Sequence, residues 1–186
     1  MNPILEAAQE ICDFIHTEGW RCCIIGGLAI QHWGEARTTL DVNITVLSGI
    51  GMEEQYANAL HARFEARIDS ALEFAVANRV LLLRSSNGID IDIALGALPF
   101  EEEMMDRLVN VEFAPGIHLP CCTAEDLFIM KMFSDRRKDR LDAESIVIRT
   151  ASLDTGYIYR QLEQIFLIAD SPDLLRQAEQ LLGDSA

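Results

Sequence analysis

The sequence predicts a mixed α/β (α+β) fold, in which a sheet flanked by helices is followed by a helical C-terminal portion. Apolar and polar residues alternate strictly over 40–46, and a second run over 89–95 has apolar residues at every other position with Asp90 and Asp92 between them, which is typical of half-buried strands because successive side chains of a strand point to opposite faces. Apolar residues at helical spacing in the last third of the chain predict the helices. We therefore divide the chain into an α/β core over 1–120 and a helical subdomain over 121–186.

The limits of the elements follow from capping and turn signals. Asn2-Pro3 is typical of a helix start, and Asn87-Gly88 predicts a hairpin. Thr123 to Asp126 resembles a capping box that opens a further helix. Up to residue 67 the sequence predicts a helix over 4–15, a strand over 21–25, a short helix over 28–33, a loop over 34–39, a strand over 40–46 and a helix over 53–67. The segment over 71–77 fits either helix or strand, and strands are predicted over 80–83 and 89–95. An outward-facing acidic helix over 100–108, strands over 109–113 and 117–120, and helices from 124 onward complete the chain.

Acidic residues occupy polar positions of both alternating strands. Asp41 and Asn43 share one face of the first strand, and Asp90 and Asp92 share one face of the second. Unpaired carboxylates on a half-buried sheet are costly, whereas divalent cations such as Mg²⁺ prefer carboxylate oxygens. The pair Gly26-Gly27 precedes a predicted short helix, whose N-terminal N–H groups suit a phosphate. Together these features suggest a place for metal and phosphate, although alternation alone fits an exposed face of an amphipathic sheet equally well.

At these residues the sequence resembles the DNA polymerase β-type nucleotidyltransferases, and in particular the AbiEii-like bacterial group found in toxin–antitoxin and phage-defence systems. The resemblance extends from about residue 24 to residue 149 and is carried by Gly26-Gly27, Arg37-Thr38-Thr39-Leu40-Asp41-Val42-Asn43 and Ile91-Asp92-Ile93. It implies a nucleotidyltransferase-like mixed sheet and a Mg²⁺-dependent transfer of an NMP from an NTP. In the family the acceptors include tRNA ends and partner proteins.

The resemblance also implies roles for individual residues. The catalytic positions are Asp41, Asn43 and Asp92. The metal ligands are Asp41 and Asp92, with Asp90 on the same face as the runner-up. The nucleotide-binding positions are Gly26, Gly27, Arg37, Thr38 and Lys131. Other interpretations stay open for two of them: Arg37 could neutralise nearby carboxylates, and Lys131 could be a surface lysine. Asp139 and Asp142 match acids in this part of the family.

Asn43 departs from the family pattern, which has an acid at this position. An amide oxygen can ligate a cation, but it is neutral and cannot bridge two metals as a carboxylate does. Three interpretations follow: a weak or altered enzyme, a protein of this fold that binds without catalysing, or an aspartate replaced by an inactivating substitution. The alternative to a transferase is therefore an inactive binding or regulatory module, such as one component of a toxin–antitoxin system.

Composition limits the remaining classes of function. The net charge of -15 repels polyanions, so we expect no non-specific binding of nucleic acid, although Arg136-Arg137-Lys138 could form a local basic patch. The 5 cysteines include no CxxC pair, which favours buried thiols over a disulfide framework or zinc site. No apolar run approaches the roughly 20 residues of a membrane span, and no signal peptide is evident, so we expect a cytoplasmic protein without membrane partners.

Overall fold

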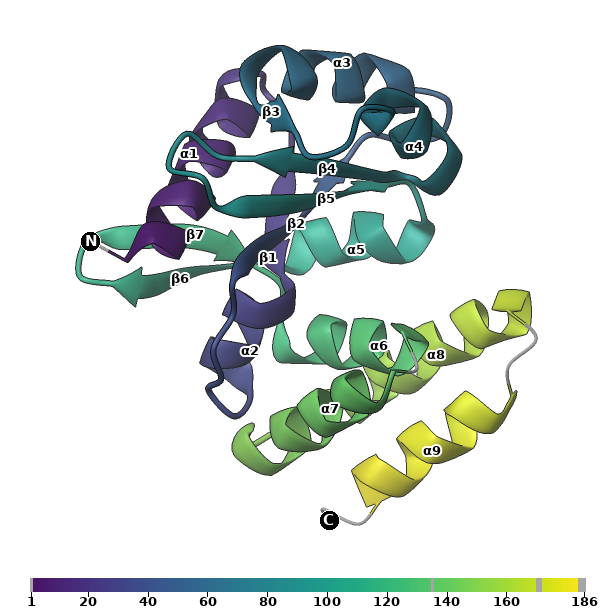
Figure 1. The fold of residues 1–186 in the computed structure, drawn as a ribbon. Coiled ribbons are helices and arrows are strands. Elements are labelled where there is room, and N and C mark those ends of the chain that lie inside the picture. Colours follow the sequence, from purple (N-terminus) through teal and green to yellow (C-terminus); the bar gives the residue numbers. More distant parts are fainter. Residues whose placement is uncertain (1, 135, 170–171, 184–186) are drawn as a thin grey trace. The chain divides into compact units, whose positions relative to one another are not determined.

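The computed structural model describes residues 2–134, 136–169 and 172–183. They form two compact units (Figure 1). The first, which we call the sheet unit, contains residues 1–28 and 38–122. The second, the helical unit, contains residues 29–37 and 123–186. The helical unit thus takes a short piece from the N-terminal part of the chain, and the chain passes between the units three times.

The sheet unit contains a mixed sheet, as the sequence predicts. In the described part of the chain seven strands pair in the order β3-β4-β5-β2-β1-β7-β6. Strand β2 is antiparallel to β1 and parallel to β5, so the two acid-bearing strands are direct neighbours. The strands are β1 (Cys22–Ile25), β2 (Asp41–Leu47), β3 (Glu65–Ala66), β4 (Val80–Arg84), β5 (Asp90–Gly96), β6 (Val109–Ala114) and β7 (Ile117–Cys121).

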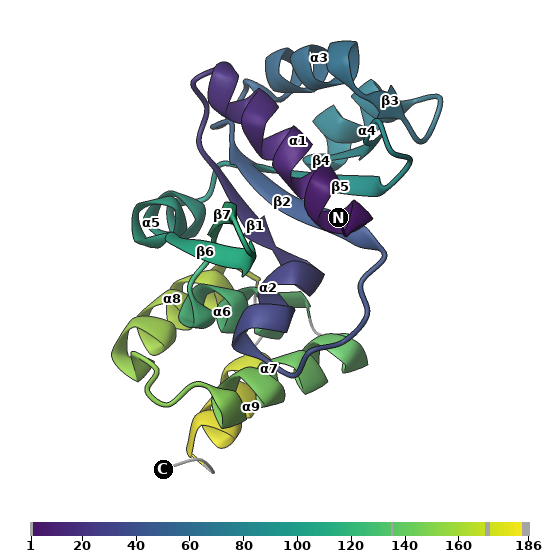
Figure 2. The ribbon, with the colours of Figure 1, turned by 90° about the vertical axis from the view of Figure 1, so that its left-hand side faces the viewer.

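Helices α1 (Pro3–Thr17), α3 (Glu53–Arg63) and α4 (Ala71–Asn78) contribute to the core against one face of this sheet (Figure 2). The predicted alternation is confirmed over 41–44 and 90–93, where the apolar positions are fully buried and the polar positions are half-buried, whereas Thr45, a polar position of β2, is buried as well. Helix α5 (Pro99–Arg107) is acidic, and it buries Phe100, Met104 and Met105. The largest buried side chains of the strands in this core are Ile24, Ile44, Leu81, Leu83, Ile91 and Ile93.

Some predicted limits of elements are wrong. The helix predicted over 53–67 ends at Arg63, because Phe64 adopts an extended backbone and buries its ring in the core. Residues 65–66 then form β3, which pairs with β4. Leu40 is not an inward-facing strand residue: β2 begins at Asp41, and Leu40 is 79% exposed. The ambiguous segment 71–77 is helical.

The helical unit contains the predicted C-terminal helices, α6 (Ala124–Ser134), α7 (Arg137–Arg149), α8 (Thr155–Ala169) and α9 (Pro172–Gly183). The predicted cap is present, since the N–H of Asp126 donates to Thr123 Oγ1 over 3.3 Å. Buried apolar residues of α6, α7 and α8 supply its interior, whereas Leu141 of α7 is 59% exposed. No helix in the described ranges is long and apolar enough to cross a bilayer.

Candidate functional site

The polar face of β2 and β5 carries the predicted acids in two cross-strand pairs. Asp41 lies opposite Asp90, and Asn43 lies opposite Asp92. Paired residues of neighbouring strands project to the same face, and the strands are about 4.8 Å apart. The sheet therefore brings all four predicted side chains together, within the sheet unit alone.

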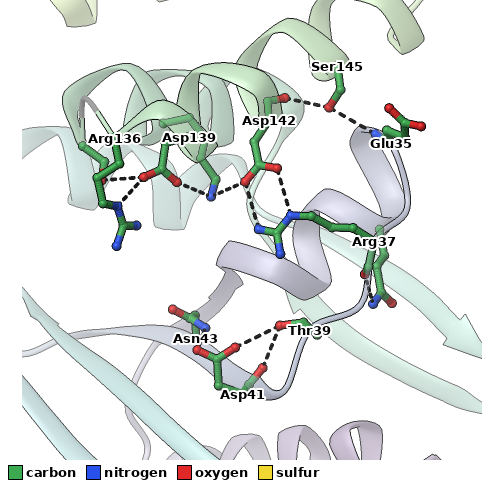
Figure 3. Close-up of polar contacts among 12 residues, drawn as sticks. Glu35, Arg37, Thr39, Asp41, Asn43, Arg136, Asp139, Asp142 and Ser145 are labelled. Atoms are coloured by element: carbon green, nitrogen blue, oxygen red, sulfur yellow. Dashed lines mark hydrogen bonds and ion pairs between the residues drawn. The ribbon is translucent and has the colours of Figure 1, made fainter.

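Asp41 is held by two neighbours on its own segment. Thr39 Oγ1 donates to Asp41 Oδ1 over 2.9 Å, and Asn43 Nδ2 donates to Asp41 Oδ2 over 2.9 Å (Figure 3). Thr39 is buried, so its hydroxyl is a fixed donor. Both carboxylate oxygens of Asp41 thus accept a hydrogen bond, and Asn43 acts here as a donor, a role that the acid of the family pattern could not take when ionised.

The glycine pair packs directly against these residues. Helix α2 (Gly26–Trp33) begins at Gly26, two residues earlier than predicted. Gly26 has φ +61°, and a Cβ there would lie 2.7 Å from Asn43 Cβ. A Cβ on Gly27 would lie 2.2 Å from Thr39 Oγ1. Neither position has room for a side chain, so bare backbone at the start of α2 lies against Thr39 and Asn43.

Asp90 and Asp92 are paired with arginines that the sequence did not single out. The Arg67 guanidinium contacts Asp92 Oδ1 through Nη1, and its Nε is 3.3 Å from Asp90 Oδ2. Arg84 Nε donates to Asp90 Oδ1 over 3.1 Å. The pairing of Arg84 with Asp90 could have been predicted from the Asn87-Gly88 hairpin, because the hairpin places the two residues opposite each other. Arg67 carried no such signal, because it lay inside the helix predicted over 53–67.

The oxygen donors of this face match the chemistry of a divalent metal. Asp41, Asp90 and Asp92 offer hard carboxylate oxygens, the ligand type that Mg²⁺ prefers. Each already has a hydrogen-bond or ion-pair partner within the chain. Among the described residues no three His, Cys, Asp or Glu side chains form a ready metal cluster. A metal would therefore share these carboxylates with the donors that already contact them.

Lys131 and Arg37 lie in the helical unit, where both are paired with acids of α7. Lys131 Nζ is 2.8 Å from Asp139 Oδ1 and 2.8 Å from Asp142 Oδ2. Arg37 donates to both oxygens of Asp142, over 2.9 Å each (Figure 3). The interpretation of Lys131 as a surface lysine is wrong, because the residue is only 7% exposed. Arg37 does neutralise a carboxylate, that of Asp142.

These contacts change the acidity of both carboxyls. Burial raises the pKa of Asp139, but hydrogen bonds from Arg136, Lys131 and Ser134 outweigh it and lower the pKa to about 2. Burial also raises the pKa of Asp142, and the hydrogen bonds from Arg37 and Lys131 outweigh it, so the net direction is down. Arg136, part of the predicted basic patch, is thus a partner of Asp139. Both acids stay ionised at neutral pH.

The predicted site residues are therefore divided between the units. The sheet unit holds Gly26, Gly27, Thr38, Asp41, Asn43, Asp90 and Asp92, and the helical unit holds Arg37 and Lys131. Within the sheet unit they converge on one face, except that Thr38 is exposed at the edge of the preceding loop.

The fold is that of nucleotidyltransferase-like proteins. An antigenic nucleotidyltransferase-like protein from Paracoccidioides brasiliensis is similar over 94% of this chain and 92% of its own, with a TM-score of 0.55 and 12% identity. The antibiotic-resistance factor ANT(2'')-Ia is similar over 91% of this chain and 94% of its own, with a TM-score of 0.55 and 13% identity. The lincosamide antibiotic adenylyltransferase LnuA, solved with lincomycin, matches over 78% and 97%, with a TM-score of 0.51 and 12% identity. Identities this low establish likeness of fold.

At the level of sequence, neither a family model nor a curated protein matches the chain.

Proposed function

We propose that this protein is a nucleotidyltransferase of the AbiEii-like kind, which moves an NMP from an NTP to a hydroxyl group of an RNA or protein acceptor. The observation that carries the proposal is the packing of Gly26-Gly27 against Thr39 and Asn43, beside Asp41. Bare backbone next to an acid-bearing strand offers N–H groups for the phosphates within reach of oxygen ligands for a metal. The fold likeness to nucleotidyltransferase-like proteins supports it.

In the proposed reaction an acceptor hydroxyl oxygen attacks the α-phosphorus of the NTP. The bond from that phosphorus to the oxygen bridging the α- and β-phosphates breaks, and pyrophosphate leaves with that electron pair. The hydroxyl proton passes to solvent or to a carboxylate of the site. Bound Mg²⁺ would shield the charge that develops on the phosphate oxygens.

The roles of the residues follow from their positions. Asp41 and Asp92 would hold Mg²⁺, with Asp90 as the neighbouring carboxylate. The first amides of α2 would receive the phosphates, and Thr38 would contact the nucleotide. We also propose Lys131 and Arg37 as nucleotide contacts. Both side chains are also paired with Asp139 or Asp142, so a nucleotide would compete with these carboxylates for their charge.

A second function is favoured by the hydrogen bond between Asn43 and Asp41 and by the ion pair between Arg67 and Asp92. Both contacts satisfy the proposed ligands within the chain, as expected of a protein that binds a nucleotide or a partner without catalysing. Such a module could be one component of a toxin–antitoxin pair, and its acidic surface suits a basic partner protein.

One experiment separates the two functions. The protein and its Asn43→Asp variant are each incubated with the four α-³²P-labelled NTPs, Mg²⁺ or Mn²⁺, and bulk tRNA, and label transfer to RNA or protein is measured. Transfer by both, faster in the variant, supports the weakened enzyme. Transfer by the variant alone supports the non-catalytic module. If neither protein transfers label and neither binds nucleotide in a separate titration, the transferase proposal fails.

A further inference from the structure

Arg67 is fixed to the candidate site by the sheet itself. It directly follows β3, and its N–H donates to the carbonyl oxygen of Leu82 over 3.1 Å. Leu82 lies opposite Asp92, and Asp92 lies opposite Asn43. One row across β2, β5 and β4 thus runs from Asn43 through Asp92 to the residue that anchors Arg67. The guanidinium reaches Asp92 because backbone pairing places it there.

The negative charges on the polar face of β2 and β5 explain why this face needs a cation to stabilise it. Asp41, Asp90 and Asp92 lie on two adjacent strands, and like charges directly opposite each other destabilise a sheet. Arg67 contacts Asp92 and also Asp90, whereas Arg84 contacts Asp90. The Arg67 side chain is 24% exposed, so solvent only partly screens its ion pairs. Of these two arginines, Arg67 is the one paired with Asp92.

We propose that Arg67 is the internal counter-ion of Asp92 and competes with a divalent metal for that carboxylate. The guanidinium occupies Asp92 Oδ1, an oxygen that a metal ligated by Asp92 would approach. A guanidinium and a divalent ion cannot share this position, because two cations in contact repel each other. A metal on either oxygen of Asp92 would therefore lie beside the guanidinium and bind less tightly than it would if the Arg67 side chain were absent. Arg67 is a positioning residue that sets the metal affinity of the site, and this inference rests on the proposed function only in taking Asp92 as a metal ligand.

The test measures the binding of a metal ion to the full chain. No nucleotide is present, so the result does not depend on catalysis. Mn²⁺ is the probe, and the electron paramagnetic resonance signal of free Mn²⁺ gives its dissociation constant. Arg67→Gln removes the competing charge and is expected to tighten Mn²⁺ binding at least about tenfold, the scale of one charge-assisted hydrogen bond. Arg63→Gln is the matched control: it also removes one arginine charge, but Arg63 pairs with Glu10 on α1. We expect less than about a twofold change there.

Adding Asp92→Asn to Arg67→Gln must abolish the gain, since the competition is for that carboxylate. Equal Mn²⁺ affinities of the parent and Arg67→Gln, or a gain that survives Asp92→Asn, would overturn the inference. If circular dichroism shows Arg67→Gln to be unfolded, Arg67→Lys replaces it. A lysine loses the two-pronged contact, so a gain of about threefold is expected and no gain refutes the proposal. Failure of nucleotidyl transfer leaves these binding measurements unchanged, so the two proposals can fail separately.

Discussion

Asn43 donates a hydrogen bond to Asp41, two residues earlier on the same face of β2, with 2.9 Å between Nδ2 and Oδ2. An ionised aspartate at position 43 has no proton to donate, so it would place a second negative charge beside the first. Asn43 thus stabilises the site without metal and removes a charge that would attract one. This single contact underlies both functions proposed above.

Replacement of Asn43 by aspartate should make the stability of the protein depend on divalent metal. Without metal we expect a loss of about 1–2 kcal/mol, because a hydrogen bond becomes a repulsion between like charges. Excess Mg²⁺ should restore most of it by binding the added acid. Thermal unfolding with Mg²⁺ and with EDTA measures this. Asn110→Asp, at an exposed position of β6, is the control, and its stability should not depend on Mg²⁺ in this way. If the stability of Asn43→Asp were the same with Mg²⁺ and with EDTA, this face of the sheet would not be a metal site.

Asp41→Ala should abolish divalent-dependent nucleotide binding and leave the fold intact. The half-buried carboxylate accepts two hydrogen bonds. Without it, Thr39 Oγ1 keeps the carbonyl oxygen of residue 41 as an acceptor, over 3.3 Å, and the half-buried Asn43 amide can turn to water, so we expect less than about 1 kcal/mol of destabilisation. Titration of a fluorescent ATP analogue in Mg²⁺ and in EDTA measures binding. Asp13→Ala, an exposed acid on α1, serves as the control. An Asp41→Ala protein that bound the Mg²⁺ complex as tightly as its parent would exclude Asp41 as a ligand.

Gly27→Ala should destabilise the sheet unit although alanine favours helices. The new methyl group would lie 2.2 Å from Thr39 Oγ1 and 2.6 Å from Thr39 Cβ, so the start of α2 or Thr39 must move. We expect a cost of about 1–3 kcal/mol, the usual penalty of overpacking, together with weaker nucleotide binding. Chemical denaturation gives the free energy of unfolding. Gly183→Ala adds the same methyl where no atom lies within 4 Å, and it should cost nothing measurable.

The acids of α7 should make the helical unit sensitive to low pH. Since the folded-state pKa of Asp139 is lowered from 3.8 to about 2, its ionised form stabilises the fold. That contribution is present above pH 4 and is lost as the pH falls from about 4 to about 2, and it amounts to about 2 kcal/mol at neutral pH.

Asp139→Asn removes this contribution, so the difference in unfolding free energy from the parent should be large at pH 7 and shrink towards pH 2.5. Urea denaturation across this range measures it. Asp173→Asn removes an exposed partner of Arg176 and should cost less than about 0.5 kcal/mol at any pH. A constant difference for Asp139→Asn would mean that the ionisation of Asp139 does not stabilise the fold.

The acid face was predictable because it depends on local pattern. Alternation around Asp41 and around Asp92 gave both strands and their polar faces, and the pairing of β2 with β5 then brought the acids together. Arg67 was not predictable, because its partner is set by β3, a two-residue strand that begins where Phe64 turns into the core. No local signal in the sequence marks an element that short.

The burial of Lys131 was equally hidden from the sequence. Its two partners lie 8 and 11 residues further along, on the next helix, so their contact depends on how α6 packs against α7. Helical spacing predicts which residues of one helix share a face, but not which residue of another helix meets them.

The helical unit is discontinuous, and this limits how the protein can be dissected. Residues 29–37 interrupt the sheet unit in sequence but take their anchors from α7: the N–H of Glu35 donates to Ser145 Oγ over 3.1 Å, and Arg37 is bound to Asp142. Truncation after residue 122 would leave this insertion without either anchor, directly before the segment that carries Thr39 and Asp41. A shortened protein would therefore disturb the loop on which the acid face depends, and inactivity of such a fragment would not show that the C-terminal helices act in catalysis.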